Sequence, residues 1–235
     1  IKQPDFGTTM VMVAVVLGMM YMAGVNAKRF TFFFLAVIGI MTAVLVAAPY
    51  RVKRLLTFLD PWEHQYDEGY QLVNSLIAVG SGGLFGSGLG QSVQKHDYLP
   101  EAHNDYIFAI IGEELGLVGT LAVVLLYLGL IYCSVTIMVR TSDRFVRLAA
   151  GGITVWITAQ ALINMGMVTG VLPVIGVPLP FISYGGSSLL ASMFAAGLLF
   201  AFSRQAPVYP LRRDPNRNLS PREIRRENED WQRRL

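Results

Sequence analysis

Residues 99–116, LPEAHNDYIFAIIGEELG, place acidic and histidine side chains directly before a stretch of apolar residues with helical spacing. Pro100 and Glu101 favour a helix start, because proline lacks an amide that the first turn leaves unbonded and a carboxylate suits the positive end of the helix dipole. We therefore expect a helix from this point, with Glu101 and Asp105 on one face. A carboxylate at a membrane boundary is partly desolvated, which raises its pKa and makes it a better proton acceptor. Asp105 is thus a candidate general base; the alternative is that it only stabilises a helix N-terminus.

The composition indicates that a bilayer surrounds most of the chain. Hydrophobic residues make up 53% and charged residues only 15%, with a mean hydropathy of +0.47, which is too apolar for an ordinary water-soluble domain. A spanning helix needs about 20 mostly apolar residues. Five stretches meet this requirement: 8–25, 30–49, 107–139, 146–170 and 184–203. We expect an all-α, polytopic transmembrane helix bundle over residues 1–203, with a large structured outer loop at 50–105.

Lysine and arginine mark the helix ends that face the cytoplasm. They gather at Lys28 and Arg29, at three arginines between 140 and 147, and at nine arginines from Arg204 onward. These segments alternate correctly if the C-terminus is cytoplasmic, which places residues 50–105 and 171–183 outside. We therefore expect the functional site on the outer side of the membrane.

The tail, residues 204–235, carries most of the positive charge. Its nine arginines stand against five acidic residues, whereas the rest of the chain has ten basic and eleven acidic residues. Its prolines and mixed charges predict a flexible cytoplasmic segment near anionic lipid. Nucleic-acid binding is not expected, since no basic face interleaved with aromatic residues accompanies the charge. The single cysteine, Cys133, cannot form an internal disulfide and is expected to be a small buried hydrophobe.

The outer segment is too long for a plain connection and should carry structure or function of its own. Arg51, Lys53 and Arg54 stand where basic residues should be scarce, so they either meet an anionic partner or snorkel at the interface. The glycine-rich stretch 80–92 lacks the Gly-Lys-Ser/Thr ending of a phosphate-binding loop for nucleotides. Its glycines form tight turns or let backbone amides approach a phosphate closely.

Polar side chains also interrupt the apolar stretches. Glu113 and Glu114 are either functional or snorkel outward to the interface. Gln160 and Asn164, four residues apart, predict interhelical hydrogen bonds. Four residues could suggest a metal site, but their spacing fits no strong ligand motif; they are His96, Asp97, Glu101 and His103.

The last loop, residues 170–188, has prolines that stop one helix and a Ser/Gly cluster that starts the next. The free amides of such a helix N-terminus point outward and can hold an anion.

Five segments closely resemble motifs of the SEDS family of bacterial membrane proteins. They are QPDFGT (3–8), PYRVKRLLTFLDPWE (49–63), GYQLVNSLIAVGSGGLFGSGLGQSVQK (69–95), LPEAHNDYIFAIIGEELG (99–116) and LPFISYGGSS (179–188). The resemblance runs from residue 3 to about residue 203 and is greatest to the cell-division members. Since the family typically has ten transmembrane helices, we expect this chain to correspond to the last five of a larger membrane protein.

The resemblance implies a peptidoglycan glycosyltransferase that inverts the anomeric carbon and polymerises lipid II into β-1,4-linked glycan strands at the outer face of the bacterial cytoplasmic membrane. It implies a class B penicillin-binding protein and other membrane proteins of the division machinery as partners, at the septum. The essential acid of the family's PEAHxD motif corresponds to Asp105. No cofactor is expected, and a divalent cation is left open. A flippase for lipid-linked precursors and a non-catalytic scaffold remain the alternatives.

Positive charge and free amides must stabilise the leaving pyrophosphate. The candidate substrate-binding residues are Arg51, Lys53, Arg54, Lys95, Glu101, His103, Ser183, Gly185, Gly186, Ser187 and Ser188. The chain departs from the family pattern at Asn104, where many relatives have Thr, and at Ile175, where a number have Lys. The second change removes a candidate phosphate contact from the last loop.

Overall fold

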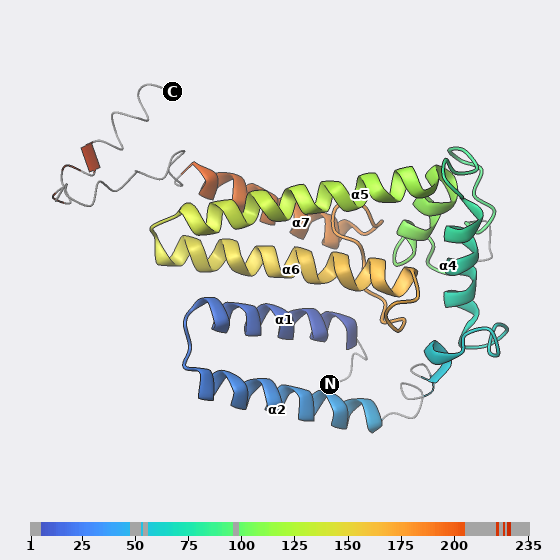
Figure 1. Ribbon diagram of the computed structural model, residues 1–235, viewed down its shortest axis with the longest axis horizontal. Coiled ribbons are helices and arrows are strands. Elements are labelled where there is room, and N and C mark those ends of the chain that lie inside the picture. The colour runs from blue at the N-terminus through green and yellow to red at the C-terminus, as the bar shows by residue number, and fades with distance from the viewer. Residues whose placement is uncertain are drawn as a thin grey trace.

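The computed structural model describes residues 6–47, 53, 56–95, 99–204, 220, 223, 225 and 226. Helices dominate these residues, and none of them lies in a strand. In chain order they are α1 (Phe6–Met22), α2 (Ala27–Val46), α4 (Tyr70–Ser81), α5 (Ile107–Arg140), α6 (Arg144–Val168) and α7 (Gly186–Ser203). The predicted all-α fold is confirmed, with α4 as a helix of the outer segment (Figure 1).

Four helices, α2, α5, α6 and α7, are long and apolar enough to cross a membrane. The fifth expected span, α1, is apolar but has 17 residues, or about 26 Å at 1.5 Å per residue. Side chains that accept from free backbone amides begin two of these helices. Asn26 Oδ1 accepts from the Lys28 amide at 3.0 Å before α2, and Asp143 Oδ1 accepts from the Phe145 amide at 2.7 Å before α6.

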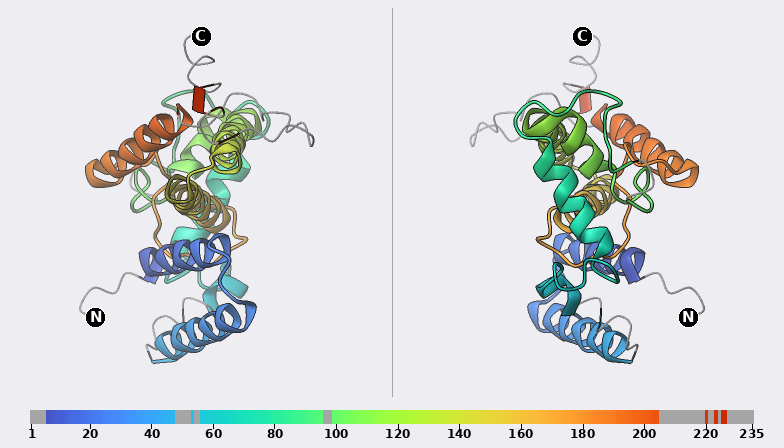
Figure 2. Two further views of the ribbon diagram at one scale, coloured as in Figure 1. Left: turned by 90° about the vertical axis from the view of Figure 1, so that its left-hand side faces the viewer. Right: turned by 90° about the vertical axis from the view of Figure 1, so that its right-hand side faces the viewer.

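The long helices lie side by side, with α6 between α5 and α1, and α7 against both α5 and α6. The α1–α2 and α5–α6 connections lie at one end of the bundle, and α4 lies at the other (Figure 1). Lys28 and Arg144 thus fall at the end opposite the outer segment, as the positive-inside pattern requires. α2 packs against α1 and stands apart from the other long helices in the side views (Figure 2).

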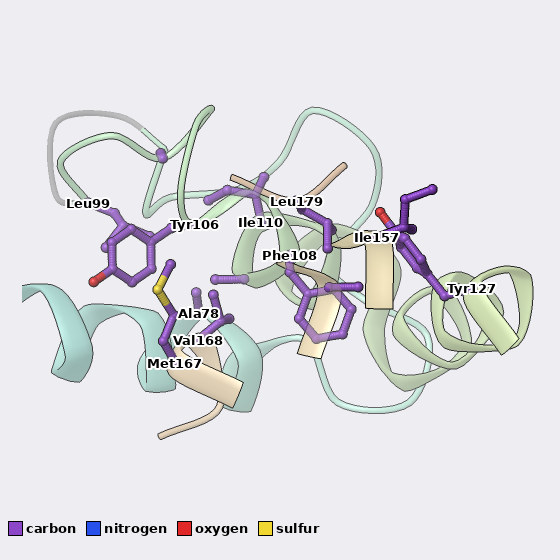
Figure 3. Packing of buried hydrophobic residues seen from close by; sticks show 13 residues of the cluster. Ala78, Leu99, Tyr106, Phe108, Ile110, Tyr127, Ile157, Met167, Val168 and Leu179 are labelled. Atoms are coloured by element: carbon purple, nitrogen blue, oxygen red, sulfur yellow. The ribbon is translucent and has the colours of Figure 1, made fainter. Parts of the chain in front are cut away.

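One hydrophobic core joins the outer segment to the bundle (Figure 3). Ala78 of α4 and Tyr106, at the start of α5, pack with Met167 of α6 and Leu179 of the α6–α7 loop. The Ser75 hydroxyl of α4 also donates to the Val168 carbonyl at 2.8 Å in a buried position. The outer segment is therefore a packed part of the protein.

Of the expectations for Cys133 and for the tail, the structure tests only the first. Cys133 is exposed, so the prediction that it is buried was wrong; its side chain lies on an outward face of α5, which a membrane would cover. Most of the tail, residues 204–235, lies outside the described residues.

Candidate active site

Asp105 lies on a loop, because α5 begins only at Ile107 and residues 99–106 form turns. The prediction of a helix start at Pro100 was wrong. Glu101 has φ +56°, a left-handed conformation that a helix cannot contain. The amides of Asn104 and Asp105 donate to the Glu101 carbonyl at 3.0 and 3.1 Å. The carboxylates of Glu101 and Asp105 therefore do not share a helix face.

Contacts with the α6–α7 loop hold this turn in place. The buried Ser183 hydroxyl donates to the Asn104 carbonyl at 2.5 Å and accepts from the Leu179 amide at 2.7 Å. The Tyr184 amide donates to the His103 carbonyl at 2.9 Å. These bonds satisfy backbone groups that a helix would otherwise use, so Ser183, predicted to contact substrate, organises the loop.

Asn164 of α6 connects the same two loops. Its side-chain amide, with the residue fully buried, donates to the carbonyls of Asp105 and Val177, both at 2.7 Å. We expected Asn164 to join helices, and it instead ties α6 to both loops of the site. Gln160, one turn earlier, makes no hydrogen bond through its buried Oε1 within the described residues.

The Asp105 carboxylate lies against the backbone at Gly176. A Cβ added to Gly176, which has φ +72°, would lie 3.2 Å from Asp105 Oδ2. The neighbouring Ile175 and Val177 side chains pack against Gly7 of α1. The Ile175 side chain is thus directed to α1, and the half-buried Asp105 is enclosed by loop backbone on this side.

A cavity of about 370 Å³ opens beside the motif loop. Its lining brings together three predicted substrate-binding residues, Lys95, Glu101 and His103. Leu99, Pro100, Ala102, Asn104 and Tyr184 complete it. Asp105 follows His103 and Asn104 in the chain but does not line this cavity, and its carboxylate lies on the Gly176 side of the loop.

Ser187 and Ser188 belong to a different opening. They line an apolar groove of about 770 Å³ between α1, α6 and α7. Gly185 is the N-cap of α7, and Gly186 is its first residue. The structure therefore separates the predicted anion site at the start of α7 from the cavity that contains Lys95.

The predicted cations are partly neutralised. Lys53 pairs with Glu68 at 2.5 Å. The hydrogen bond from Lys53 holds the pKa of Glu68 below its usual range, and the same bond raises the pKa of Lys53. Both groups therefore stay charged around neutral pH. Arg51 and Arg54 lie outside the described residues.

The glycine-rich stretch forms tight turns that pack against a break in α5. Gly116 has non-helical backbone angles, φ 66° and ψ −159°. Before this break the carbonyls of Glu113 and Glu114 accept from the amides of Ser87 and Gly88 at 2.9 and 3.0 Å. After it, the amides of Leu117 and Val118 donate to the carbonyls of Gly83 and Leu84 at 2.9 and 3.2 Å. The turns thus satisfy both helix ends that the break exposes.

Among the described residues, no three His, Cys, Asp or Glu side chains lie close enough to hold a metal ion. Two of the four residues considered as a metal site, His96 and Asp97, lie outside the described residues.

Replacing Asn164 by leucine should destabilise the protein and slow any reaction at Asp105. The Asp105 and Val177 carbonyls would lose their donor in a buried place, which costs about 1–3 kcal/mol. Gln160→Leu is the matched control on the same helix and should be nearly neutral, because it removes an oxygen that accepts no hydrogen bond there. Thermal unfolding of the two variants in detergent measures the difference, and equal melting temperatures would contradict the bridging role.

The chain matches a family model described as cell cycle protein, which covers the FtsW, RodA and SpoVE proteins, over residues 1–207. It is 53% identical over 200 residues to a probable peptidoglycan glycosyltransferase FtsW of Dichelobacter nodosus, covering 84% of this chain and 50% of that protein. It is 45% identical over 202 residues to stage V sporulation protein E of Bacillus subtilis, covering 86% and 55%. The chain spans about half the length of the curated relatives it matches.

A solved structure is similar in fold, with a TM-score of 0.69 and 25% identity over 88% of this chain and 58% of the other. That structure is described as showing the coordination of polymerization and crosslinking by a peptidoglycan synthase complex.

Proposed function

Because the chain belongs to the FtsW/RodA/SpoVE family of cell cycle proteins, the SEDS family, we propose that it forms the catalytic half of a peptidoglycan glycosyltransferase that polymerises lipid II. The observation that carries the proposal is the position of Asp105. Asp105 lies on the loop whose preceding residues, His103 and Asn104, line the cavity, and Asn164 holds its backbone carbonyl. Its carboxylate lies beside Gly176.

In the proposed reaction Asp105 takes the proton from the 4-hydroxyl of the acceptor sugar. The hydroxyl oxygen attacks the anomeric carbon of the donor sugar, and the bond to the polyprenyl pyrophosphate breaks with inversion. The pyrophosphate leaves with the electron pair of that bond. A base positioned in this way typically contributes about 10²–10⁴ in rate.

The leaving pyrophosphate requires positive charge or free amides. We propose that Lys53 and the amides at the start of α7 provide them, which places the pyrophosphate at the groove lined by Ser187 and Ser188 and outside the cavity that contains Lys95. Lys53 would then exchange its contact with Glu68 for one with substrate. We also propose a division role at the septum, which the description of the matching family as a cell cycle protein supports, and a class B penicillin-binding protein as partner, which the similar synthase complex supports. We further propose a cytoplasmic C-terminus, from the position of the basic connections.

A flippase for lipid-linked precursors is the competing function. Transport sites typically lie near the bilayer midplane with paired charges. The acidic and basic side chains of the candidate site, among them Lys95, Glu101 and Asp105, lie instead at the end of the bundle that carries α4, which favours the polymerase. A non-catalytic scaffold would need no half-buried acid held in a loop beside such a cavity.

The test is polymerisation of purified lipid II by a full-length SEDS protein that carries this chain as its C-terminal half. The protein is reconstituted in vesicles with a class B penicillin-binding protein whose transpeptidase is blocked. Glycan ladders on a gel are expected. A parallel assay follows labelled lipid II across the vesicle membrane, and lipid movement without ladders would replace the polymerase with the flippase.

A further inference from the structure

Two neighbouring glutamates turn from α5 toward the outer segment. Glu113 is 4% exposed, and its carboxylate accepts from the Ser92 hydroxyl at 2.5 Å and the Val93 amide at 2.8 Å. The Glu114 carboxylate accepts from the Lys95 ammonium at 2.7 Å and, more weakly, from the Ser92 amide at 3.4 Å. Both carboxylates therefore hold residues 92–95, which shows that the snorkelling alternative was wrong.

The burial of these groups gives the contacts their importance. A carboxylate in a low-dielectric place is tolerated only when hydrogen bonds or an opposite charge compensate it. Glu113 is compensated by a hydroxyl and backbone amides, and Glu114 by Lys95, whose side chain is only 19% exposed. A pair of this kind contributes little net stability, but breaking one side of it is strongly unfavourable. It fixes geometry.

These contacts fix the geometry of the candidate site. Lys95 lines the cavity together with Glu101 and His103. The first turns of α5, before the break at Gly116, have Asp105 just ahead of their start and Glu113 and Glu114 near their end. One short helical segment of α5 therefore follows Asp105 directly and, through Glu114, holds Lys95 in the wall of the cavity.

We propose, on the basis of the polymerase function above, that Glu113, Glu114 and Lys95 are positioning residues for the transfer reaction. Glu113 fixes the 92–95 segment, and Lys95 acts through its ion pair with Glu114 to set the cavity wall relative to Asp105. Lys95 does not serve as a free cation for the pyrophosphate, since its charge is matched by Glu114 and its side chain is only 19% exposed, whereas the paired Lys53 side chain is 58% exposed.

Charge exchange tests this proposal, because an ion pair can be rebuilt in reverse whereas a cation that binds phosphate cannot become a glutamate. The variants are Lys95→Glu, Glu114→Lys and the double exchange, in the full-length protein with its penicillin-binding partner. We expect each single variant to slow lipid II polymerisation by roughly ten- to a hundredfold, the loss that follows a displacement of about 1 Å in a site. The double variant should return to within about threefold of wild type, as a coupled pair requires.

The loss in the single variants should fall on kcat, with the KM for lipid II changed by less than about threefold, because the substrate contacts remain. Glu113→Gln should cause a similar kcat loss while preserving side-chain size. Glu63→Gln is the control, since Glu63 is exposed elsewhere in the outer segment, and it should polymerise at the wild-type rate.

A double variant as slow as Lys95→Glu would show that the Lys95–Glu114 pair does not account for the loss and would overturn the proposal. Single variants at the wild-type rate would also overturn it. Absence of glycan from the wild-type protein would instead contradict the proposed polymerase function, so the two failures are distinguishable.

Discussion

Asp105→Asn should reduce lipid II polymerisation by about 10²–10⁴ while leaving the protein folded. The amide has nearly the shape of the carboxylate but cannot take a proton from the acceptor hydroxyl. The Asp105 carbonyl, which accepts from Asn164 at 2.7 Å, is unchanged by the substitution. The measurement is the initial rate of glycan formation by the full-length protein with its partner, together with thermal unfolding in the same detergent.

Asp143→Asn is the matched control for this variant. Asp143 is the N-cap of α6 at the opposite end of the bundle, and asparagine caps helices about as well as aspartate. This variant should retain both rate and melting temperature. If Asp105→Asn polymerises as fast as Asp143→Asn, the base is another group. If Asp105→Asn melts well below it, the lost rate reflects folding and the assignment of a proton acceptor is unsupported.

The sequence was sufficient to predict the membrane helices, because each one is recorded locally in about 20 apolar residues. Four of them have the expected length and composition, and α1 is a shorter apolar helix close to its expected place. The placement of the two basic connections at one end of the bundle, opposite α4, also followed from local information, namely the positions of Lys28 and Arg144 at helix starts.

The loop that presents Asp105 could not be predicted in the same way. Pro100 and Glu101 carry a good local signal for a helix start, yet hydrogen bonds from Ser183 and Tyr184, about 80 positions away, hold the preceding backbone in turns. Local propensity is a weak prior that tertiary contacts override. The role of Asn164 was hidden for the same reason, since its partners belong to two loops distant in sequence.

Nothing in the sequence indicated the roles of Ser92 and Gly176. A buried serine that donates to Glu113 looks like any loop serine, and the approach of Gly176 to Asp105 depends on the path of two loops. Of the two alternatives for the glycine-rich stretch, the structure shows the tight turns. What those turns pack against could not be inferred, because a break inside the apolar sequence of α5 is visible only as one more glycine, Gly116.

Gly116→Ala should strongly destabilise the outer half of the bundle. Its backbone angles, φ 66° and ψ −159°, lie in a region that is essentially restricted to glycine. A Cβ would also lie 2.4 Å from the Gly86 amide nitrogen and 2.6 Å from the Leu84 carbonyl. Backbone strain of about 1–3 kcal/mol and overpacking of about 1–3 kcal/mol together predict a loss of about 2–6 kcal/mol in the free energy of unfolding.

Gly129→Ala provides the control on the same helix, because a Cβ there meets no atom within 4 Å and alanine favours a helix interior over glycine by about 0.5–1 kcal/mol. Thermal unfolding should therefore separate the two variants in opposite directions from wild type. Gly86 lies on the other side of the same contact, and a Cβ there would lie 2.1 Å from the Glu114 carbonyl oxygen. Gly86→Ala should therefore lower the melting temperature as Gly116→Ala does. If Gly116→Ala melts like Gly129→Ala, α5 can continue through residue 116 as an unbroken helix. The turns at 83–88 would then not be needed to hold Glu113 and Glu114 beside the cavity.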